Sequence, residues 1–329
     1  MPKAIRIYEQ GTPEVMKWED VEIGPPGAGE VRLRHEAIGL NYIDTYHRGG
    51  VYKIPMPSGI GSEAAGVVDA LGPGVAEFAV GDRVIYATGT PLQPVGSYAE
   101  VRNIPVARLV ALPDGIGSEQ AAAMMLKGMT VQYLIKRTYR VSAGETVLFH
   151  AAAGGVGLIA CQWLKALGVT MIGTAGSDEK CALAKAHGAA HCINYRTEDF
   201  VARVKEITGG KGVPVVYDGV GKDAYEGSLE CLSPFGMYVN FGNASGPVPP
   251  FDLVARLKGT LFATRPSLGP YTTPRPLLVT TAADLFEVVR SGTVRIDINQ
   301  RYPLKDAVRA HLDLESRRTT GSTVLLPQG

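Results

Sequence analysis

The chain has 329 residues, of which 45% are hydrophobic and 20% charged. This length and composition indicate about two globular domains and exclude a disordered chain. The net charge is only +1, so no strong field favours a nucleic acid or an anionic membrane as partner. The four cysteines form no Cys-x-x-Cys pair, and no apolar run approaches the ~18 residues of a membrane span. We therefore expect a cytoplasmic protein with reduced thiols.

The first part of the chain, up to about residue 115, consists of short apolar runs broken by glycine and proline. Runs at 31–34, 66–71 and 82–86 are typical of strands, and residues 41–48 indicate one short helix. This pattern predicts an irregular, β-rich domain.

The pattern becomes helical from Ser118, whose hydroxyl is suited to cap a helix over 118–126. Gly128 predicts a bend, and a second helix is expected over 130–137.

Strands and helices then alternate, which favours a parallel, doubly wound sheet. After it we expect helices at 282–291 and 304–316 and a closing strand at 321–326. The predicted strands of the sheet are 146–150, 169–174, 191–194, 214–218, 237–241 and 260–264.

The strongest motif joins the first of these strands to a helix through Gly154, Gly155, Val156 and Gly157. Against the pattern Gly-x-Gly-x-x-Gly, only the first position differs, since it holds Ala152. Glycines here let the backbone approach a pyrophosphate and let the helix pack closely on the sheet, while the helix N-terminus attracts the phosphates. The motif predicts dinucleotide binding.

The end of the second strand bears on which dinucleotide is bound. NAD enzymes usually place a carboxylate there to hold the ribose 2′-hydroxyl, but this chain has Ala175 and Gly176. The absence of an acid at these positions favours NADPH. In the alternative interpretation, Asp178 or Glu179 holds the ribose hydroxyls from one or two positions later.

Four nearby side chains are suited to bind a 2′-phosphate. Ser177 and Lys180 follow the second strand, and Tyr195 and Arg196 follow the third. Because the carboxyl ends of parallel strands share one edge of the sheet, we expect these residues to gather there.

Over essentially its whole length the chain resembles the zinc-free quinone oxidoreductases, the zeta-crystallin-like branch of the medium-chain dehydrogenase/reductase superfamily. The resemblance lies in ordered segments spread along the sequence. They are 38–46, 61–66, 81–84, 149–157, 216–218, 240–243, 264–268 and 315–317.

The resemblance implies a reaction without zinc. Zinc-dependent members carry Gly-His-Glu where this chain has Gly61-Ser62-Glu63, and no cysteine precedes Cys161, so the usual zinc ligands are missing. Without a Lewis acid, the expected acceptor is already electrophilic, as a quinone is. An enone or alkenal reductase is the alternative enzyme. A structural or RNA-binding role with bound NADPH is disfavoured by the balanced charge.

The resemblance also implies a fold, an assembly and a set of site residues. Residues 1–124, completed by 267–329, would form a GroES-like catalytic domain, and 125–266 a Rossmann NADPH-binding domain. A homodimer would pair the edge strand Thr260–Thr264 of two copies. Residues implied in cofactor binding are Tyr42, Ile43, Asp44, Thr45, Tyr46, Lys127, Thr130, Tyr133, Gly154, Gly155, Val156, Gly157, Gly176, Ser177, Lys180, Tyr195, Phe241, Gly242, Asn243, Ser267, Leu268 and Arg317.

Some of these assignments have structural alternatives. Tyr133 and Leu268 are equally suited to packing, and Lys127 and Thr130 to capping a helix.

The catalytic candidates are Asn41, Tyr46 and Tyr52. The amide of Asn41 is suited to donate to an acceptor carbonyl between the domains, or to cap the short helix. Tyr52 either donates a proton or walls the cleft.

Overall fold

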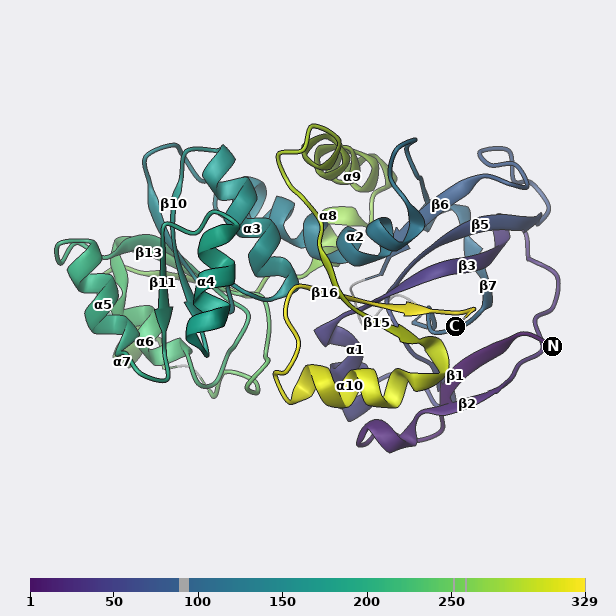
Figure 1. The fold of residues 1–329 in the computed structure, drawn as a ribbon, viewed down its shortest axis with the longest axis horizontal. Coiled ribbons are helices and arrows are strands. Elements are labelled where there is room, and N and C mark those ends of the chain that lie inside the picture. The colour runs from purple at the N-terminus through teal and green to yellow at the C-terminus, as the bar shows by residue number, and fades with distance from the viewer. Residues whose placement is uncertain (89–94, 251, 258, 329) are drawn as a thin grey trace. The chain divides into compact units, whose positions relative to one another are not determined.

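The computed structural model describes residues 1–88, 95–250, 252–257 and 259–328. The chain divides into two compact units (Figure 1): unit 1 is Met1–Met129, Leu268–Arg290 and Ile296–Gly329, and unit 2 is Thr130–Ser267 and Ser291–Arg295. The division falls inside helix α2 (Ser118–Tyr133), whereas the sequence placed it at residue 124.

Unit 2 is built on a six-stranded sheet with the order β11-β10-β9-β12-β13-β14, in which every neighbouring pair is parallel. The order steps outward from β9 in both directions, which is the doubly wound arrangement predicted from the alternating pattern. That prediction is confirmed. The strands are β9 (Thr146–Phe149), β10 (Thr170–Ala175), β11 (His191–Asn194), β12 (Val213–Asp218), β13 (Leu232–Asn240) and β14 (Phe262–Thr264).

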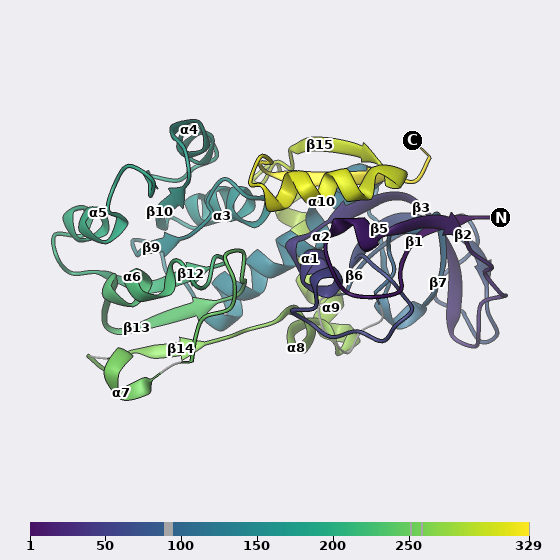
Figure 2. The ribbon, with the colours of Figure 1, turned by 90° about the horizontal axis from the view of Figure 1, so that it is seen from below.

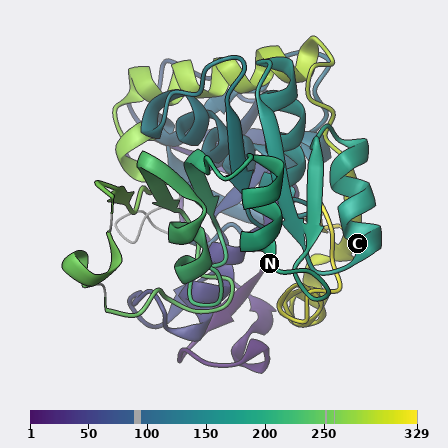
Figure 3. The same cartoon turned by 90° about the vertical axis from the view of Figure 1, so that its left-hand side faces the viewer.

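Helices cover this sheet on two sides, which explains why its strands are apolar runs rather than alternating ones. Leu148, Ile172 and Ile193 pack in one cluster with Val204 of α5 and Leu229 of α6. Helices α3 and α4 contact each other and β10, and Figure 3 shows α4 on the other side of the strands from α5. The helices are α3 (Gly155–Ala166), α4 (Asp178–Ala186), α5 (Phe200–Ile207), α6 (Tyr225–Glu230) and α7 (Leu253–Arg256).

Unit 1 is the predicted β-rich part. One sheet has the order β15-β16-β3-β5-β6-β8, with β7 also paired to β3, and a three-stranded sheet has the order β2-β1-β4. The strands are β1 (Lys3–Ile7), β2 (Lys17–Asp20), β3 (Glu30–Leu40), β4 (Ser58–Gly59), β5 (Glu63–Leu71), β6 (Arg83–Ala87), β7 (Val101–Pro105), β8 (Val110–Ala111), β15 (Ile298–Pro303) and β16 (Ser322–Leu326).

The C-terminal segment is part of the same core as the N-terminal strands. Strand β16 pairs antiparallel with β3, with Leu325 opposite Ile38. Ala307 and Ala310 of α10 lie in the cluster that contains Ile38 and Leu325. Figure 2 shows α10 running beside β15. The helices of this unit include α1 (Tyr42–Gly49), α8 (Leu268–Thr272), α9 (Arg275–Arg290) and α10 (Ala307–Glu315), and the 3-10 turns are Pro13–Val15, Val106–Arg108 and Leu304–Asp306.

The predicted bend at Gly128 is wrong, because α2 runs through it without interruption to Tyr133 and ends in a π-helix at Leu134–Thr138. A Cβ atom at position 128 would lie 2.4 and 2.6 Å from the Cδ atoms of Leu285 in α9. The glycine therefore allows two helices to approach closely.

Some element boundaries also differ from the prediction. Helix α9 begins at Arg275, before the expected 282, and β14 begins at Phe262 rather than at 260. Across the described ranges, no helix is both long enough and apolar enough to cross a membrane.

Candidate functional site

The glycine motif connects β9 to α3 as predicted, with Gly154 at the N-cap position of the helix. A Cβ atom at Gly157 would lie 2.5 Å from the carbonyl oxygens of both Ala151 and Ala152. Any side chain there would push α3 away from the loop. The first turn of α3 therefore keeps its N–H groups close to the turn, in the arrangement that suits a phosphate.

Alanine at the first position of the motif is accommodated by a second glycine. A Cβ atom at Gly173 of β10 would lie 2.6 Å from the methyl group of Ala152. The space that the motif usually obtains from its first glycine is thus supplied by the neighbouring strand.

At the end of β10, the side chain of Ser177 caps α4 by accepting a hydrogen bond from the N–H of Lys180, at 3.3 Å. The Asp178 carboxylate accepts a hydrogen bond from the amide of Asn194 at 2.8 Å. This contact ties α4 to the end of β11 and gives Asp178 a structural role, which weakens the alternative in which it holds a ribose.

The end of β11 brings Tyr195 and Arg196 to Gly176, as the sequence predicted. A Cβ atom at Gly176 would lie 2.7 Å from the Tyr195 hydroxyl and 3.5 Å from Nε of Arg196. Tyr195 is 39% exposed, so its ring is open to a ligand. A phenol and a guanidinium thus lie next to a glycine at the end of β10, where the strand end itself carries no carboxylate.

Phe241, Gly242 and Asn243 directly follow β13 at the same edge of the sheet. The Phe241 ring lies 5.6 Å from that of Phe149, and a Cβ atom at Gly242 would be 2.6 Å from the Gly219 carbonyl oxygen. This turn is therefore packed tightly against the segment that follows β12.

In unit 1, Asn41 occupies the N-cap position of α1, and its backbone N–H donates to the Asp44 carboxylate at 2.9 Å. Its side-chain nitrogen donates to Glu63 at 2.7 Å and, more weakly, to the Gly39 carbonyl at 3.4 Å. The sequence assigned this amide to an acceptor carbonyl, but in the structure its hydrogens already point at protein oxygens.

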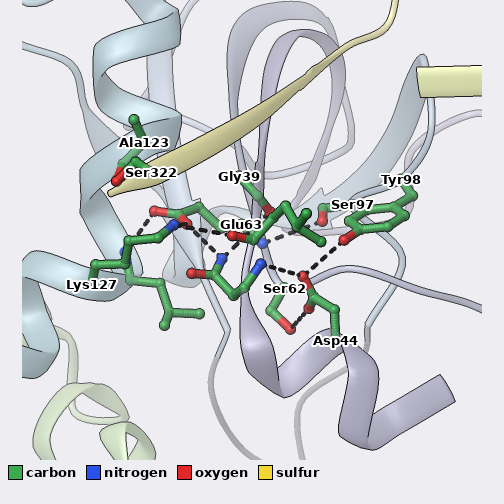
Figure 4. Close-up of polar contacts among 12 residues, drawn as sticks. Gly39, Asp44, Ser62, Glu63, Ser97, Tyr98, Ala123, Lys127 and Ser322 are labelled. Carbon is green, nitrogen blue, oxygen red and sulfur yellow. Dashed lines mark hydrogen bonds and ion pairs between the residues drawn. The ribbon is translucent and has the colours of Figure 1, made fainter. Parts of the chain in front are cut away.

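Glu63 is fully buried between three donors (Figure 4). Besides Asn41, its carboxylate accepts from the backbone N–H of Leu126 at 2.6 Å, and Nζ of Lys127 lies 3.8 Å away. Burial raises the pKa of Glu63, and Lys127 and these hydrogen bonds oppose the rise. Burial likewise lowers the pKa of Lys127, while Glu63 opposes the change. Each partner therefore offsets part of the other's desolvation.

Asp44 is the second buried carboxylate. It accepts from the Ser62 hydroxyl at 2.7 Å and from the Tyr98 hydroxyl at 3.0 Å, in addition to the Asn41 N–H. Burial raises its pKa to about 6, although all three hydrogen bonds and the charge of Lys127 favour the ionised form.

Three tyrosines form a cluster at α1. The Tyr46 ring lies 5.8 Å from that of Tyr42 and 5.5 Å from that of Tyr52, with the latter pair edge to face. Tyr46 is 8% exposed, so it is mainly a packing residue, whereas Tyr42 and Tyr52 are half-buried. The exposed side chain of Arg317 is close enough to Tyr42 to oppose the rise in the pKa of Tyr42 that burial causes.

Comparison with known proteins identifies the family. A model of the alcohol dehydrogenase GroES-like domain matches residues 27–114, and one of the zinc-binding dehydrogenases matches 155–267. A quinone oxidoreductase of Pseudomonas aeruginosa is 55% identical over 329 residues, covering 99% of this chain and 100% of the relative. The chain belongs to the quinone oxidoreductase family.

Two further relatives extend this comparison. The crystal structure of the Escherichia coli quinone oxidoreductase complexed with NADPH has a TM-score of 0.96 and 49% identity, covering 99% of this chain and 100% of that one. A 2-haloacrylate reductase of a Burkholderia species is 44% identical over 337 residues and is covered completely, as is this chain. The family and the fold class expected from the sequence are confirmed, and the protein is an oxidoreductase of the medium-chain superfamily.

The residue at the position of the zinc-binding histidine makes a hydrogen bond within the protein. Ser62, which replaces the histidine, is a hydrogen-bond donor to Asp44. Within the part of the chain that the structure describes, no three His, Cys, Asp or Glu side chains are grouped to hold a metal ion.

Several predicted contact residues are buried. Tyr133 is 2% and Leu268 4% exposed, which fits the packing alternative for both. Lys127 donates to the Leu40 carbonyl at 3.2 Å and is paired with Glu63, so its ammonium group has a structural role as well as any role toward a ligand.

The sequence missed a group of buried polar residues behind Asp44, namely Tyr98, His311 and Arg48. They are far apart in the chain and match no motif. A charged or polar residue within an apolar run was the only available signal.

Proposed function

We propose that the protein transfers a hydride from NADPH to a quinone without zinc. Family membership supports the reaction class. The choice of NADPH rests on the end of β10. There Gly176 lies next to Tyr195 and Arg196, and positions 175 and 176 hold alanine and glycine in place of an acidic residue.

The residues fit such a cofactor. Only glycine fits at Gly157, beside the turn that opens α3, and at Gly176, next to the Tyr195 hydroxyl. Bound NADPH supplies the hydride. The N–H groups that open α3 would hold the pyrophosphate, and the positive charges of Lys180 and Arg196 would attract the 2′-phosphate.

The remaining cofactor contacts are proposed from the family resemblance. The residues proposed to contact the cofactor in this way are Tyr42 to Tyr46, Lys127, Thr130, Phe241, Gly242, Asn243, Ser267 and Arg317. Tyr133 and Leu268 would act through packing.

On the acceptor side we propose Asn41, Tyr46 and Tyr52. Donation by Asn41 to an acceptor oxygen requires its amide to exchange Glu63 for that oxygen. The half-buried rings of Tyr42 and Tyr52, each packed against Tyr46, would stack on a planar quinone.

A turnover assay with NADPH and NADH against a panel of quinones tests the proposal. Lys180→Ala should weaken the binding of NADPH by about 10- to 150-fold, because one charge-assisted contact to the 2′-phosphate is lost. The affinity for NADH should be nearly unchanged. Lys185→Ala, an exposed lysine in the last turn of the same helix, is the matched control. Equal losses for both cofactors, or no quinone turnover, would contradict the proposal.

The second candidate is reduction of an activated carbon–carbon double bond, and the 44% identity to a 2-haloacrylate reductase favours it. The same assay, extended to enones and 2-haloacrylates, separates the two by their kcat/KM values.

We also propose that two copies pair through β14. This strand ends the sheet order of unit 2, and Phe262 in it is 53% exposed. An apolar edge strand needs cover, and an identical edge provides it. Light scattering at micromolar concentration should give the mass of a dimer; a monomer would contradict the pairing.

A further inference from the structure

A chain of hydrogen bonds starts and ends in helix α1. Arg48, in the last turn, lies with Nη1 3.2 Å from Nδ1 of His311 on α10. Nε2 of His311 lies 3.0 Å from the Tyr98 hydroxyl, which donates to Oδ2 of Asp44, in the first turn, at 3.0 Å. None of these four residues is more than 3% exposed, so water does not replace the contacts.

The chemistry of the groups fixes the direction of every bond in this chain. A guanidinium only donates, so Nδ1 of His311 carries no proton. The proton of the neutral ring is therefore on Nε2 and is donated to Tyr98, whose own proton goes to Asp44. Burial and the charge of Arg48 lower the pKa of His311 to about 3, so the ring stays neutral.

This series of hydrogen bonds does not conduct protons, because Arg48 does not release one at any ordinary pH. At the Arg48 end, the hydrogen bonds instead fix the guanidinium in place. Nη1 and Nη2 of Arg48 donate to the two carboxylate oxygens of Glu315, at 2.9 and 2.7 Å, and Nε donates to the Gly11 carbonyl at 3.1 Å. A bidentate pair of this kind holds the guanidinium in one orientation.

The near end of the chain meets the site. Oδ2 of Asp44, which accepts from Tyr98, is the same oxygen that accepts the backbone N–H of Asn41. The other groups that act on this carboxylate are the Ser62 hydroxyl and the charge of Lys127. Figure 4 shows Tyr98 and Ser62 approaching Asp44 from opposite directions.

We propose that Tyr98, His311 and Arg48 are positioning residues that clamp both ends of α1 to α10. The clamp sets the place of Asn41 and Tyr42 and of Arg317, which lies two residues beyond Glu315. This inference rests on the proposed function, which assigns those three residues to the cofactor and the acceptor.

Tyr98→Phe tests the clamp by removing one hydroxyl. The matched control is Tyr86→Phe, because Tyr86 is also buried and pairs with a histidine, His35, at 3.1 Å, but donates nothing to Asp44. Hydrogen exchange of the Asn41 backbone N–H is measured in the cofactor-free protein, together with kcat and KM.

In Tyr98→Phe we expect exchange at Asn41 to become about 10-fold faster, because Asp44 loses a partner that orients it. We expect kcat/KM for the quinone to fall about 3- to 10-fold through misplacement of the site. Tyr86→Phe should leave the exchange rate at Asn41 and kcat/KM unchanged, even if it lowers the melting temperature as much as Tyr98→Phe does. The same response in both variants, or no response at Asn41, would overturn the clamp.

Glu315→Gln provides a second test if Tyr98→Phe does not fold, since the Glu315 side chain is 35% exposed. It should speed exchange at Asn41 by about 3-fold through the loosened guanidinium, and an unchanged rate would count against the clamp. If the wild type reduces no quinone, the proposed function fails, while the exchange measurement still decides the clamp.

Discussion

The buried carboxylate of Asp44 makes the stability of the protein depend on pH in a direction that can be calculated. Asp44→Asn removes its charge and keeps its shape. The Asn41 N–H and the Tyr98 hydroxyl still find the remaining oxygen, and the Ser62 hydroxyl rotates to accept from the new amide.

The magnitude follows from the pKa of the buried group. Burial raises the pKa of Asp44 from 3.8 to about 6. Between these values the folded protein binds more protons at this site than the unfolded chain, so its stability falls as the pH rises. At about 1.36 kcal/mol per pKa unit the full shift is worth about 3 kcal/mol, and the wild type should lose about 2 kcal/mol of this between pH 4 and pH 7 relative to the variant.

The assay is urea unfolding of wild type and Asp44→Asn at several pH values from 4 to 7, without cofactor. Asp69→Asn, which alters an exposed aspartate of β5, gives the baseline for removing a charge at the surface. The difference in unfolding free energy should move in favour of the Asp44→Asn variant as the pH rises. A difference that stays constant, or that moves toward the wild type, would refute the assignment of a raised pKa to Asp44.

Three other predictions concern single positions. Gly128→Ala should destabilise the protein by about 1 kcal/mol, because the clash with Leu285 outweighs the gain in helix propensity. In a protein that already carries Leu285→Ala, the same substitution should be stabilising. Thermal unfolding of the two single variants and of the double variant checks this reversal. Gly157→Ala should lower the melting temperature and weaken NADPH binding, whereas Gly24→Ala, whose Cβ meets no atom within 4 Å, should do neither. Turnover should be unchanged in EDTA, because Ser62 replaces the zinc-binding histidine; activity lost in chelator and restored by zinc would contradict this.

The parallel sheet and its glycine motif were predictable because the information is local. Each strand is one apolar run, the turn from β9 to α3 carries its own glycines, and the ends of β10 and β11 meet whenever the strands are neighbours. Gly176, Tyr195 and Arg196 were expected together for that reason and are found together.

Gly128 shows where local information fails. A glycine within a helical pattern predicts a bend, but its cause is the side chain of Leu285 on a helix that comes much later in the chain. Arg48, His311 and Tyr98 were missed for the same reason, since each bond in their chain joins distant segments and no spacing rule connects them.

Asn41 was predictable in part from local sequence and in part depends on contacts with distant segments. Its position before a short helix identified it as a cap or as a ligand contact, and the structure gives it two buried carboxylates, one for its backbone N–H and one for its amide. Zinc-dependent relatives carry a histidine where Ser62 stands, and here Ser62 donates to one of those carboxylates. Two desolvated charges are costly unless they are well paired, yet Lys127 is the only cation that interacts with both Asp44 and Glu63 among the interactions described above. The remaining compensation is supplied by donors that are oriented from outside the site, Leu126 for Glu63 and Tyr98 for Asp44. The placement of Asn41 therefore depends on hydrogen bonds whose orientation is set in α2 and α10, and changes in those helices should affect the site although none of their residues need touch the acceptor.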